Sequence, residues 1–251
     1  MEKLTIRAVG GPTALLELGG LRILTDPTFD PPGEYETPVV TLHKSQGPAI
    51  SADEIGDVDV VLLSHDHHAD NLDDAGRELL PRARSVLTTV EGAERLGGEN
   101  VAGLEPWSSV SVGPLGITAV PAHHGPEDKY ELIGPVIGFV LKGNDLPTVY
   151  VSGDNASVDV VRSIAERVGD IDVAILFAGG AYVERLEAFV TLTSERAAEA
   201  AQALGARAVI ALHHNGWGHF TQDLSSLQAA FAEAGLADRL VGLEPGESAT
   251  V

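Results

Sequence analysis

Three histidines and three aspartates lie within nine consecutive positions of this chain, in the stretch LSHDHHADNLD at residues 63–73. The whole chain has nine histidines, and eight of them lie in three short stretches that each follow an apolar run. These stretches read HDHHAD, AHHGP and HHNGWGHF, and a fourth apolar run ends in SGDN. Imidazole and carboxylate groups are the ligands expected for zinc, manganese or iron. The sequence therefore predicts a metal site where several strands end.

Each stretch also has an interpretation without a metal. A histidine pair at the end of a strand can be solvated or can cap a turn, and the Gly, Asn and Asp residues of HHG and SGDN are common in turns. The GDN segment could also cap a helix that begins at residue 157. Without a metal site, these separate interpretations would have to hold independently at all four strand ends. We therefore favour a single site formed by all four.

Composition limits the classes of ligand and partner. The chain has no cysteine, which excludes disulfides, thiolate zinc sites and iron–sulfur clusters, so histidines and carboxylates must hold any ion. Its 37 acidic and 16 basic residues give a formal net charge of −21, without a run of lysines or arginines. We therefore expect a small-molecule substrate as the partner, and neither nucleic acid nor a membrane surface. The sequence leaves open whether the chain forms a homo-oligomer.

The N-terminal stretch gives no sign of export. It lacks a continuous apolar core and is interrupted by Arg7 and Glu17, which argues against a signal peptide. No apolar run approaches the ~18 residues that a membrane-spanning helix needs. We therefore expect a cytoplasmic protein.

Ten strands and four helices are expected to position the polar residues. The strand candidates are apolar or alternating segments between glycine-containing turns. They cover residues 4–9, 13–18, 21–26, 57–64, 85–90, 116–122, 136–142, 147–152, 172–178 and 207–214. Helical patterns cover residues 71–80, 157–169, 193–205 and 224–236. Since no linker or repeat interrupts the chain, residues 1–251 are expected to form a single mixed α/β domain.

The order of these motifs resembles that of the metallo-β-lactamase-fold hydrolase superfamily. The motifs GGLRILTDPTF, LLSHDH, PAHHGP, SGDN and LHHNGW are most similar to the bacterial branch related to ascorbate-phosphate lactonases and N-acyl phosphatidylethanolamine phospholipases. The resemblance implies a four-layer αββα sandwich, in which two mixed sheets lie between helices and the metal ions sit at one edge. Phospholipase activity is not expected, because the sequence has no basic amphipathic stretch for a membrane surface.

The histidine-rich loop departs from the pattern of that family. The family's loop reads His-x-His-x-Asp-His, whereas this chain has one additional residue. If the loop is aligned from the preceding strand, the first two metal-facing histidines are His65 and His67. Relatives that have glutamine at the position of His67 favour His65 and His68 instead. Either way Asp70 takes the family's aspartate position and Asn71 that of its last histidine. Because an amide oxygen is a poorer zinc ligand than imidazole, the resemblance predicts a weakened or lost second ion.

The same resemblance assigns the other ligands. His124 fits better than His123 because it directly precedes a Gly-Pro turn, Asp154 matches a bridging carboxylate, and His213 matches the terminal histidine. The implied first site contains His65, His68 or His67, His124 and Asp154, and the second contains Asp70, Asp154 and His213. Asp26, Asp66 and Asn71 are expected to support the ligands from outside, with a turn cap before Pro27 as the alternative for Asp26. The expected cofactor is one or two Zn²⁺, with Mn²⁺ or Fe as alternatives.

This ligand set predicts hydrolytic chemistry. A zinc ion with an open position would make hydroxide available near neutral pH for attack on a carbonyl or phosphoryl centre. Asp70 is expected to orient that water or to accept its proton. His219 is a candidate donor to the oxyanion, and Trp217 is a candidate wall of the substrate site, with core packing as its alternative. His43, the isolated histidine, is expected to have no role.

Two functions from different classes fit these residues. The favoured function is a metal-dependent hydrolase of a small-molecule ester, lactone, amide or phosphoester. The alternative is a non-hydrolytic or metal-deficient member of the same fold, which would act as a binding protein or as a single-metal biosynthetic enzyme. Asn71 and the additional loop residue support that alternative. The segments 27–57 and 179–192 are the expected specificity loops, and their sequences identify no ligand.

Overall fold

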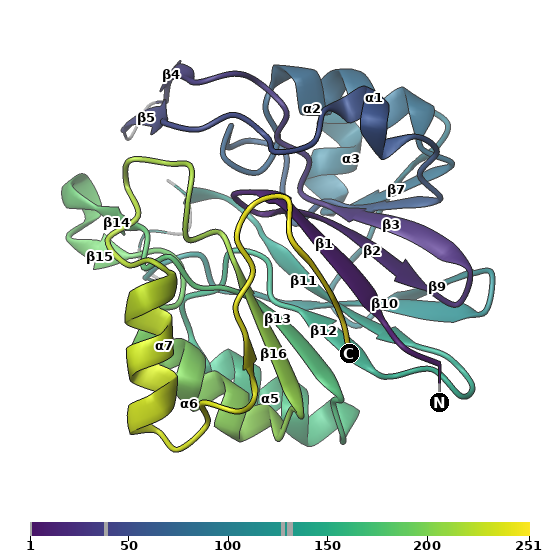
Figure 1. The fold of residues 1–251 in the computed structure, drawn as a ribbon. Coiled ribbons are helices and arrows are strands. Elements are labelled where there is room, and N and C mark those ends of the chain that lie inside the picture. The colour runs from purple at the N-terminus through teal and green to yellow at the C-terminus, as the bar shows by residue number, and fades with distance from the viewer. Residues whose placement is uncertain (1, 38–39, 127–128, 130–132) are drawn as a thin grey trace.

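Two seven-stranded sheets form the centre of the computed structural model, which describes residues 2–37, 40–126, 129 and 133–251 (Figure 1). The first sheet contains, in spatial order, β18 (Ser248–Thr250), β1 (Thr5–Gly10), β2 (Thr13–Leu18), β3 (Leu21–Thr25), β6 (Val60–Leu62), β7 (Ser85–Thr88) and β8 (Val101–Gly103). The second contains β17 (Leu240–Val241), β16 (Ala208–Leu212), β13 (Val173–Phe177), β12 (Val149–Val151), β11 (Ile137–Lys142), β10 (Leu115–Pro121) and β9 (Ser109–Val112). Each sheet combines antiparallel and parallel pairs, so both are mixed.

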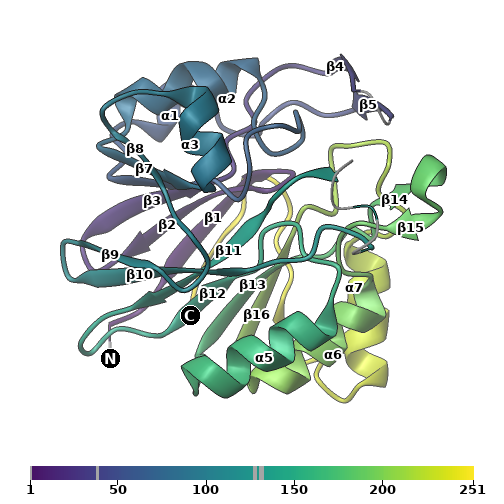
Figure 2. The same ribbon diagram turned by 180° about the vertical axis from the view of Figure 1, so that it is seen from behind.

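The sheets pack face to face, with helices on both outer faces. The first sheet is covered by α1 (Ala52–Ile55), α2 (Asp74–Leu79) and α3 (Val90–Leu96), and the second by α5 (Val158–Val168), α6 (Ser194–Leu204) and α7 (Leu224–Glu233). Figure 2 shows the same layers from behind. Buried aliphatic side chains fill the space between the sheets and the space under each helical layer. The predicted αββα sandwich is therefore confirmed. None of the helices in the described part of the chain is long and apolar enough to cross a membrane.

Local sequence explains where the two longest helices begin and end. At the start of α6 the hydroxyl of Thr193 accepts a hydrogen bond from the backbone N–H of Arg196, and Gly205 ends the helix in the left-handed conformation. Ser157 caps α5 in the same way. Strand β13 is buried along its whole length between two parallel neighbours, which explains its continuous apolar sequence VAILF.

Several predicted boundaries were wrong for local reasons. The helix expected at residues 71–80 begins at Asp74, because the Asp73 carboxylate accepts a hydrogen bond from the N–H of Gly76 and caps it. The strand expected at 85–90 ends at Thr88, because Thr89 caps helix α3, which the sequence patterns did not predict. Helix α1 was also missed, although Ser51 and Glu54 form a capping box.

Two short hairpins occupy segments that were expected to be loops. The first consists of β4 (Gly33–Glu36) and β5 (Thr41–Lys44). The second consists of β14 (Tyr182–Val183) and β15 (Ala188–Phe189), joined through the 3₁₀ turn Glu184–Leu186. Figure 1 shows both hairpins at the same side of the molecule, one beside each helical layer.

A buried ion pair anchors the β4–β5 hairpin to the rest of the fold. Nζ of Lys44 lies 2.7 Å from Oδ2 of Asp73, and the two side chains are 3% and 0% exposed. We expect Lys44→Met to lower the free energy of unfolding by about 3–5 kcal/mol in urea denaturation, because it leaves a carboxylate buried without its cation. The matched control is Arg82→Met, which removes the exposed Arg82–Asp53 pair and should cost less than about 1 kcal/mol. Equal losses in the two variants would contradict this role.

Candidate metal centre

The four polar strand ends meet at one edge of the sandwich. Strand β6 leads into the histidine-rich loop, while β10, β12 and β16 lead into His124, Asp154 and His213. Strands β12, β13 and β16 are parallel, and β10 runs in the same direction because two antiparallel pairings separate it from β12. Their carboxyl ends therefore lie on the same side, which brings distant positions of the sequence together.

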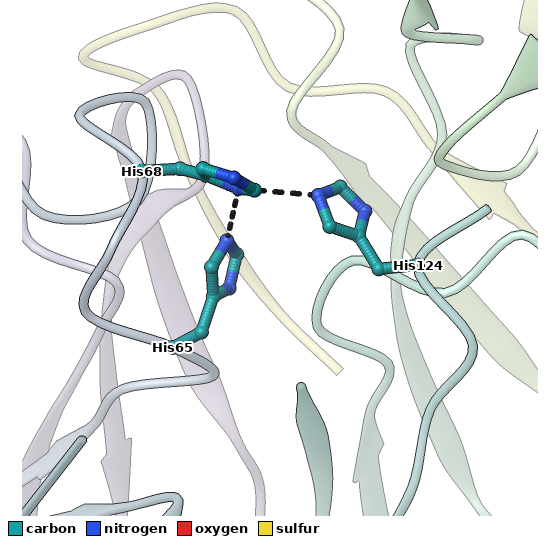
Figure 3. Close-up of side chains that lie close together, drawn as sticks. All are labelled: His65, His68 and His124. Atoms are coloured by element: carbon teal, nitrogen blue, oxygen red, sulfur yellow. Dashed lines mark hydrogen bonds between the residues drawn. The ribbon is translucent and has the colours of Figure 1, made fainter. Parts of the chain in front are cut away.

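Three imidazoles form a first cluster, the histidine triad: His65, His68 and His124 (Figure 3). Nε2 of His65 lies 3.0 Å from Nδ1 of His68, and Nε2 of His124 lies 3.2 Å from the same nitrogen. Burial lowers the pKa of all three imidazoles, to about 3 for His68. Burial therefore favours the neutral form of the histidine triad, which is the state in which imidazole binds a cation.

Two carboxylates and one imidazole form a second cluster, the acidic triad: Asp70, Asp154 and His213. Nε2 of His213 lies 3.3 Å from Oδ2 of Asp70 and 3.5 Å from Oδ1 of Asp154. Burial alone would lower the pKa of His213, but Asp154 and Asp70 raise it to about 10. The pKa of each carboxyl is lowered in turn, against the effect of burial. The acidic triad therefore stabilises a positive charge.

Asp154 connects the two triads. Its Oδ2 lies 3.7 Å from Nε2 of His124, while its Oδ1 faces His213. Asn71 holds this carboxylate, because its Nδ2 donates hydrogen bonds to Oδ1 of Asp154 (3.3 Å) and to the hydroxyl of Ser64 (3.4 Å). The position that the resemblance matches to the family's last histidine thus holds a side chain that orients the Asp154 carboxylate.

Both triads fit a divalent ion. The nearest donor atoms within and between them are 3.0–3.7 Å apart. A tetrahedral shell with zinc–ligand bonds of about 2.0–2.1 Å places its donor atoms about 3.3 Å from one another. In addition, both ring nitrogens of His213 are buried and have no hydrogen-bond partner among the described residues. Nε2 of His213 is thus a buried nitrogen that faces two carboxylates without a well-formed hydrogen bond to either, as an ion site requires.

The other histidines of these stretches lie outside both triads. His67 points away, because its Nε2 donates a hydrogen bond to the carbonyl of Ile133 at 2.6 Å. His214 is buried behind the site, and burial lowers its pKa. His43 lies on the β4–β5 hairpin, exposed and 3.3 Å from Glu34. Of the two alignments of the loop, the geometry therefore favours His65 with His68, and His124 in preference to His123.

Polar residues around the triads hold the ligands in place. Oδ1 of Asp26 accepts hydrogen bonds from the backbone N–H (2.7 Å) and hydroxyl (2.8 Å) of Ser64, whose hydroxyl lies 2.9 Å from Nδ1 of His65. Burial raises the pKa of Asp26. Asp66 accepts a hydrogen bond from Nε of Arg95 at 3.0 Å, which fixes the start of the loop. Asp26 and Asp66 thus lie where supporting residues were expected, while Ser64 was missed because a serine before a histidine carries no distinctive signal.

A cavity opens beside the triads. Its polar end is lined by His68, Asp70, His124 and His219. Nε2 of His219 lies 3.1 Å from Oδ2 of Asp70. Trp217 is not among the described lining residues of this cavity; it packs instead against Tyr35 and under the ammonium group of Lys44. The structure therefore favours core packing for Trp217 and leaves His219 facing the space where a substrate would bind.

Comparison with known proteins agrees with this architecture. Residues 21–214 match the family model described as the Beta-lactamase superfamily domain. The chain belongs to this family. One relative of this beta-lactamase superfamily chain, a UPF0173 metal-dependent hydrolase of Pyrococcus furiosus, is 30% identical over 210 residues, covering 81% of this chain and 87% of the relative. Another, from Methanopyrus kandleri, is 29% identical over 241 residues, covering 93% and 94%.

Solved structures share the beta-lactamase superfamily fold with this chain. An isothiocyanate hydrolase from Delia radicum gut bacteria has a TM-score of 0.84 at 22% identity, and the match covers 98% of both chains. Igni18, a metallo hydrolase from Ignicoccus hospitalis, has a TM-score of 0.76 at 22% identity, covering 100% of this chain and 99% of that chain. The predicted membership of the metallo-β-lactamase-fold superfamily is therefore confirmed.

Proposed function

We propose that this chain is a metal-dependent hydrolase in which the histidine triad and the acidic triad each hold one divalent ion and share Asp154. The observation that carries this proposal is the pair of buried triads on one carboxylate, with a neutral set of imidazoles on one side and a cation-stabilising set on the other. The names of the Pyrococcus furiosus and Methanopyrus kandleri relatives support the class of reaction.

The donor atoms favour zinc, with manganese or iron as the alternatives. Three imidazole nitrogens with an adjacent carboxylate suit zinc, and two carboxylates with one imidazole suit any of these ions. When bound, such ions lower the pKa of a coordinated water and stabilise the negative charge that develops on a substrate oxygen. Asn71 adds no imidazole to the acidic triad, so we expect its ion to be the more weakly held of the two.

Asp70 and His219 are the side chains that we place at the reacting atoms. Both line the cavity, and their 3.1 Å contact fixes each relative to the other. The Asp70 carboxylate can orient a water molecule by accepting its hydrogen, and His219 can donate a hydrogen bond to the oxyanion or to the leaving group. The reaction would add water across an ester, lactone, amide or phosphoester bond.

Removing the metal tests this function directly. We expect a chelator to lower hydrolysis by about 10³-fold or more, and added zinc or manganese to restore it, because the charge stabilisation supplied by the ions amounts to several kcal/mol. The assay would use a panel of chromogenic esters, lactones, amides and phosphoesters. Metal-loaded Asp70→Asn is the matched control, since it keeps the histidine triad and should bind metal without hydrolysing substrate.

Two results would count against the proposal. Hydrolysis that survives both chelation and Asp70→Asn would show that the activity does not use this site. Metal uptake by the wild type without hydrolysis of any substrate in the panel would favour the non-hydrolytic alternative.

A further inference from the structure

The described lining of the cavity beside the triads is polar at one end and mostly aliphatic elsewhere. Apart from the four polar residues named above, its described lining consists of Thr37 and six aliphatic side chains: Val40, Leu42, Ile133, Val183, Leu186 and Val190. The aliphatic residues come from the β4–β5 hairpin, from the segment before β11, and from the β14–β15 region. Apolar walls with a few polar groups are typical of small-molecule sites.

The polar groups of the wall are already paired within the protein. The hydroxyl of Thr37 donates to the carbonyl of Val40 at 2.6 Å and accepts from the N–H of the same residue at 3.0 Å. Nδ1 of His124 donates to the carbonyl of Val190 at 2.7 Å. Among the lining side chains that the structure describes, those of the triads and His219 are therefore the ones that offer polar atoms to a ligand.

Positive charge is absent from the lining that the structure describes, since neither a lysine nor an arginine belongs to it. Lys44, on the same hairpin as Leu42, is paired with Asp73 and covered by Trp217. A formal net charge of −21 also makes the surrounding field unfavourable for anions. The proposed ions would bind the oxygens of a phosphoester as well as a carbonyl oxygen, but phosphoester sites commonly add cationic side chains around the non-bridging oxygens, and the described lining supplies none.

The aliphatic wall is a packed unit of its own. Ile133, Val183, Leu186 and Val190 form a buried cluster separate from the three main layers of the core. A side chain at Gly125 would collide with this wall, because a Cβ there would lie 2.9 Å from Cδ1 of Ile133 and 3.1 Å from Cγ1 of Val190. The wall thus packs closely against the backbone at Gly125.

Building on the proposed hydrolase function, we infer that the substrate is an uncharged ester, lactone or amide whose aliphatic or aromatic group rests on this wall, and that it is not a phosphoester. In the reaction the bond between the carbonyl carbon and its oxygen or nitrogen breaks, and the oxygen of water bonds to that carbon. One proton of the water goes to the leaving oxygen or nitrogen, and the products are a carboxylic acid and an alcohol or amine. The aliphatic wall would determine which aliphatic or aromatic groups of the substrate are preferred, although these groups take no part in the reaction.

Calorimetry on the zinc-loaded protein can test this inference with three probes. Acetohydroxamate and hexanohydroxamate carry the same metal-binding group on tails of different length, and hexylphosphonate carries an anionic group on a similar tail. We expect hexanohydroxamate to bind about 100-fold more tightly than acetohydroxamate, because four further methylenes are buried on the wall. Hexylphosphonate should bind more weakly than hexanohydroxamate.

A pair of leucine variants locates the effect. Leu186→Ala should reduce the advantage of the longer tail by about tenfold, because it removes part of the wall. Leu236→Ala is the matched control: Leu236 is equally buried, but in the cluster under helices α5–α7, so the preference should not change.

The possible failures are distinguishable. Equal affinities of the two hydroxamates would overturn this inference, and so would tighter binding of hexylphosphonate than of hexanohydroxamate. Neither result would contradict the proposed metal-dependent hydrolase function. If neither hydroxamate binds, the proposed function fails and this inference fails with it.

Discussion

Replacing Asp154 with alanine is expected to lower kcat/KM by about 10³-fold or more. Asp154 is buried between the triads, 3.7 Å from His124 on one side and 3.5 Å from His213 on the other. Its removal takes a carboxylate from both proposed ion sites at once. A loss of several kcal/mol of charge stabilisation corresponds to this factor, since each ~1.4 kcal/mol is tenfold in rate. The measurements are kcat/KM on the best substrate of the panel and metal content by elemental analysis.

An exposed aspartate provides the control for this experiment. The side chain of Asp159 is 89% exposed and pairs with Arg162. Asp159→Ala should therefore leave both kcat/KM and metal content unchanged. An Asp154→Ala variant that keeps its metal and most of its activity would show that this carboxylate does not join two ion sites.

The second large effect should separate two neighbouring histidines. His68 faces His65 and His124 across 3.0 and 3.2 Å, whereas His67 donates to the carbonyl of Ile133. We expect His68→Gln to weaken the ion of the histidine triad by more than about 100-fold, since even residues that only support a ligand are worth 10–100-fold in affinity. His67→Gln should change the affinity by less than about tenfold.

This pair of variants contains its own control, because the same substitution is made at adjacent positions of one loop. Zinc affinity is measured by competition with a chromophoric chelator, and folding is checked by circular dichroism. A larger loss of zinc affinity in His67→Gln than in His68→Gln would contradict this assignment and would mean that His67 is the ligand.

Local patterns in the sequence predicted most of the strands and the place of the site. Strands such as β13 and β16 are buried along nearly their whole length and therefore appear as unbroken apolar runs. Polar residues that follow such runs lie at a sheet edge, which is why the stretches containing His124, Asp154 and His213 could be singled out from the sequence. The choice of these three residues within the stretches came from the family resemblance. Helix α3 was missed because Gly92 interrupts a short helical pattern that has no strong apolar periodicity.

The direction of individual side chains depended on contacts far along the chain. His67 is turned outward by a carbonyl 66 positions away, and Asn71 contacts a carboxylate 83 positions away. Trp217 packs against Tyr35 on a hairpin that the sequence patterns did not predict. These contacts form only when the two sheets and the hairpins are assembled, so no local pattern could reveal them.

The central claim is that the chain holds two ions on chemically different triads, and zinc titration of the metal-free protein in a calorimeter tests it most directly. The titration is run at about pH 6 in buffers of different ionisation enthalpy, which gives the number of protons released by each ion. His68, with a pKa of about 3, is neutral at this pH and burial lowers the pKa of His65 and His124, whereas His213, with a pKa of about 10, still carries a proton. We predict two equivalents of zinc, the tighter one bound almost without proton release and the weaker one with the release of about one proton. A single equivalent, or two equivalents without proton release, would contradict the two-ion account.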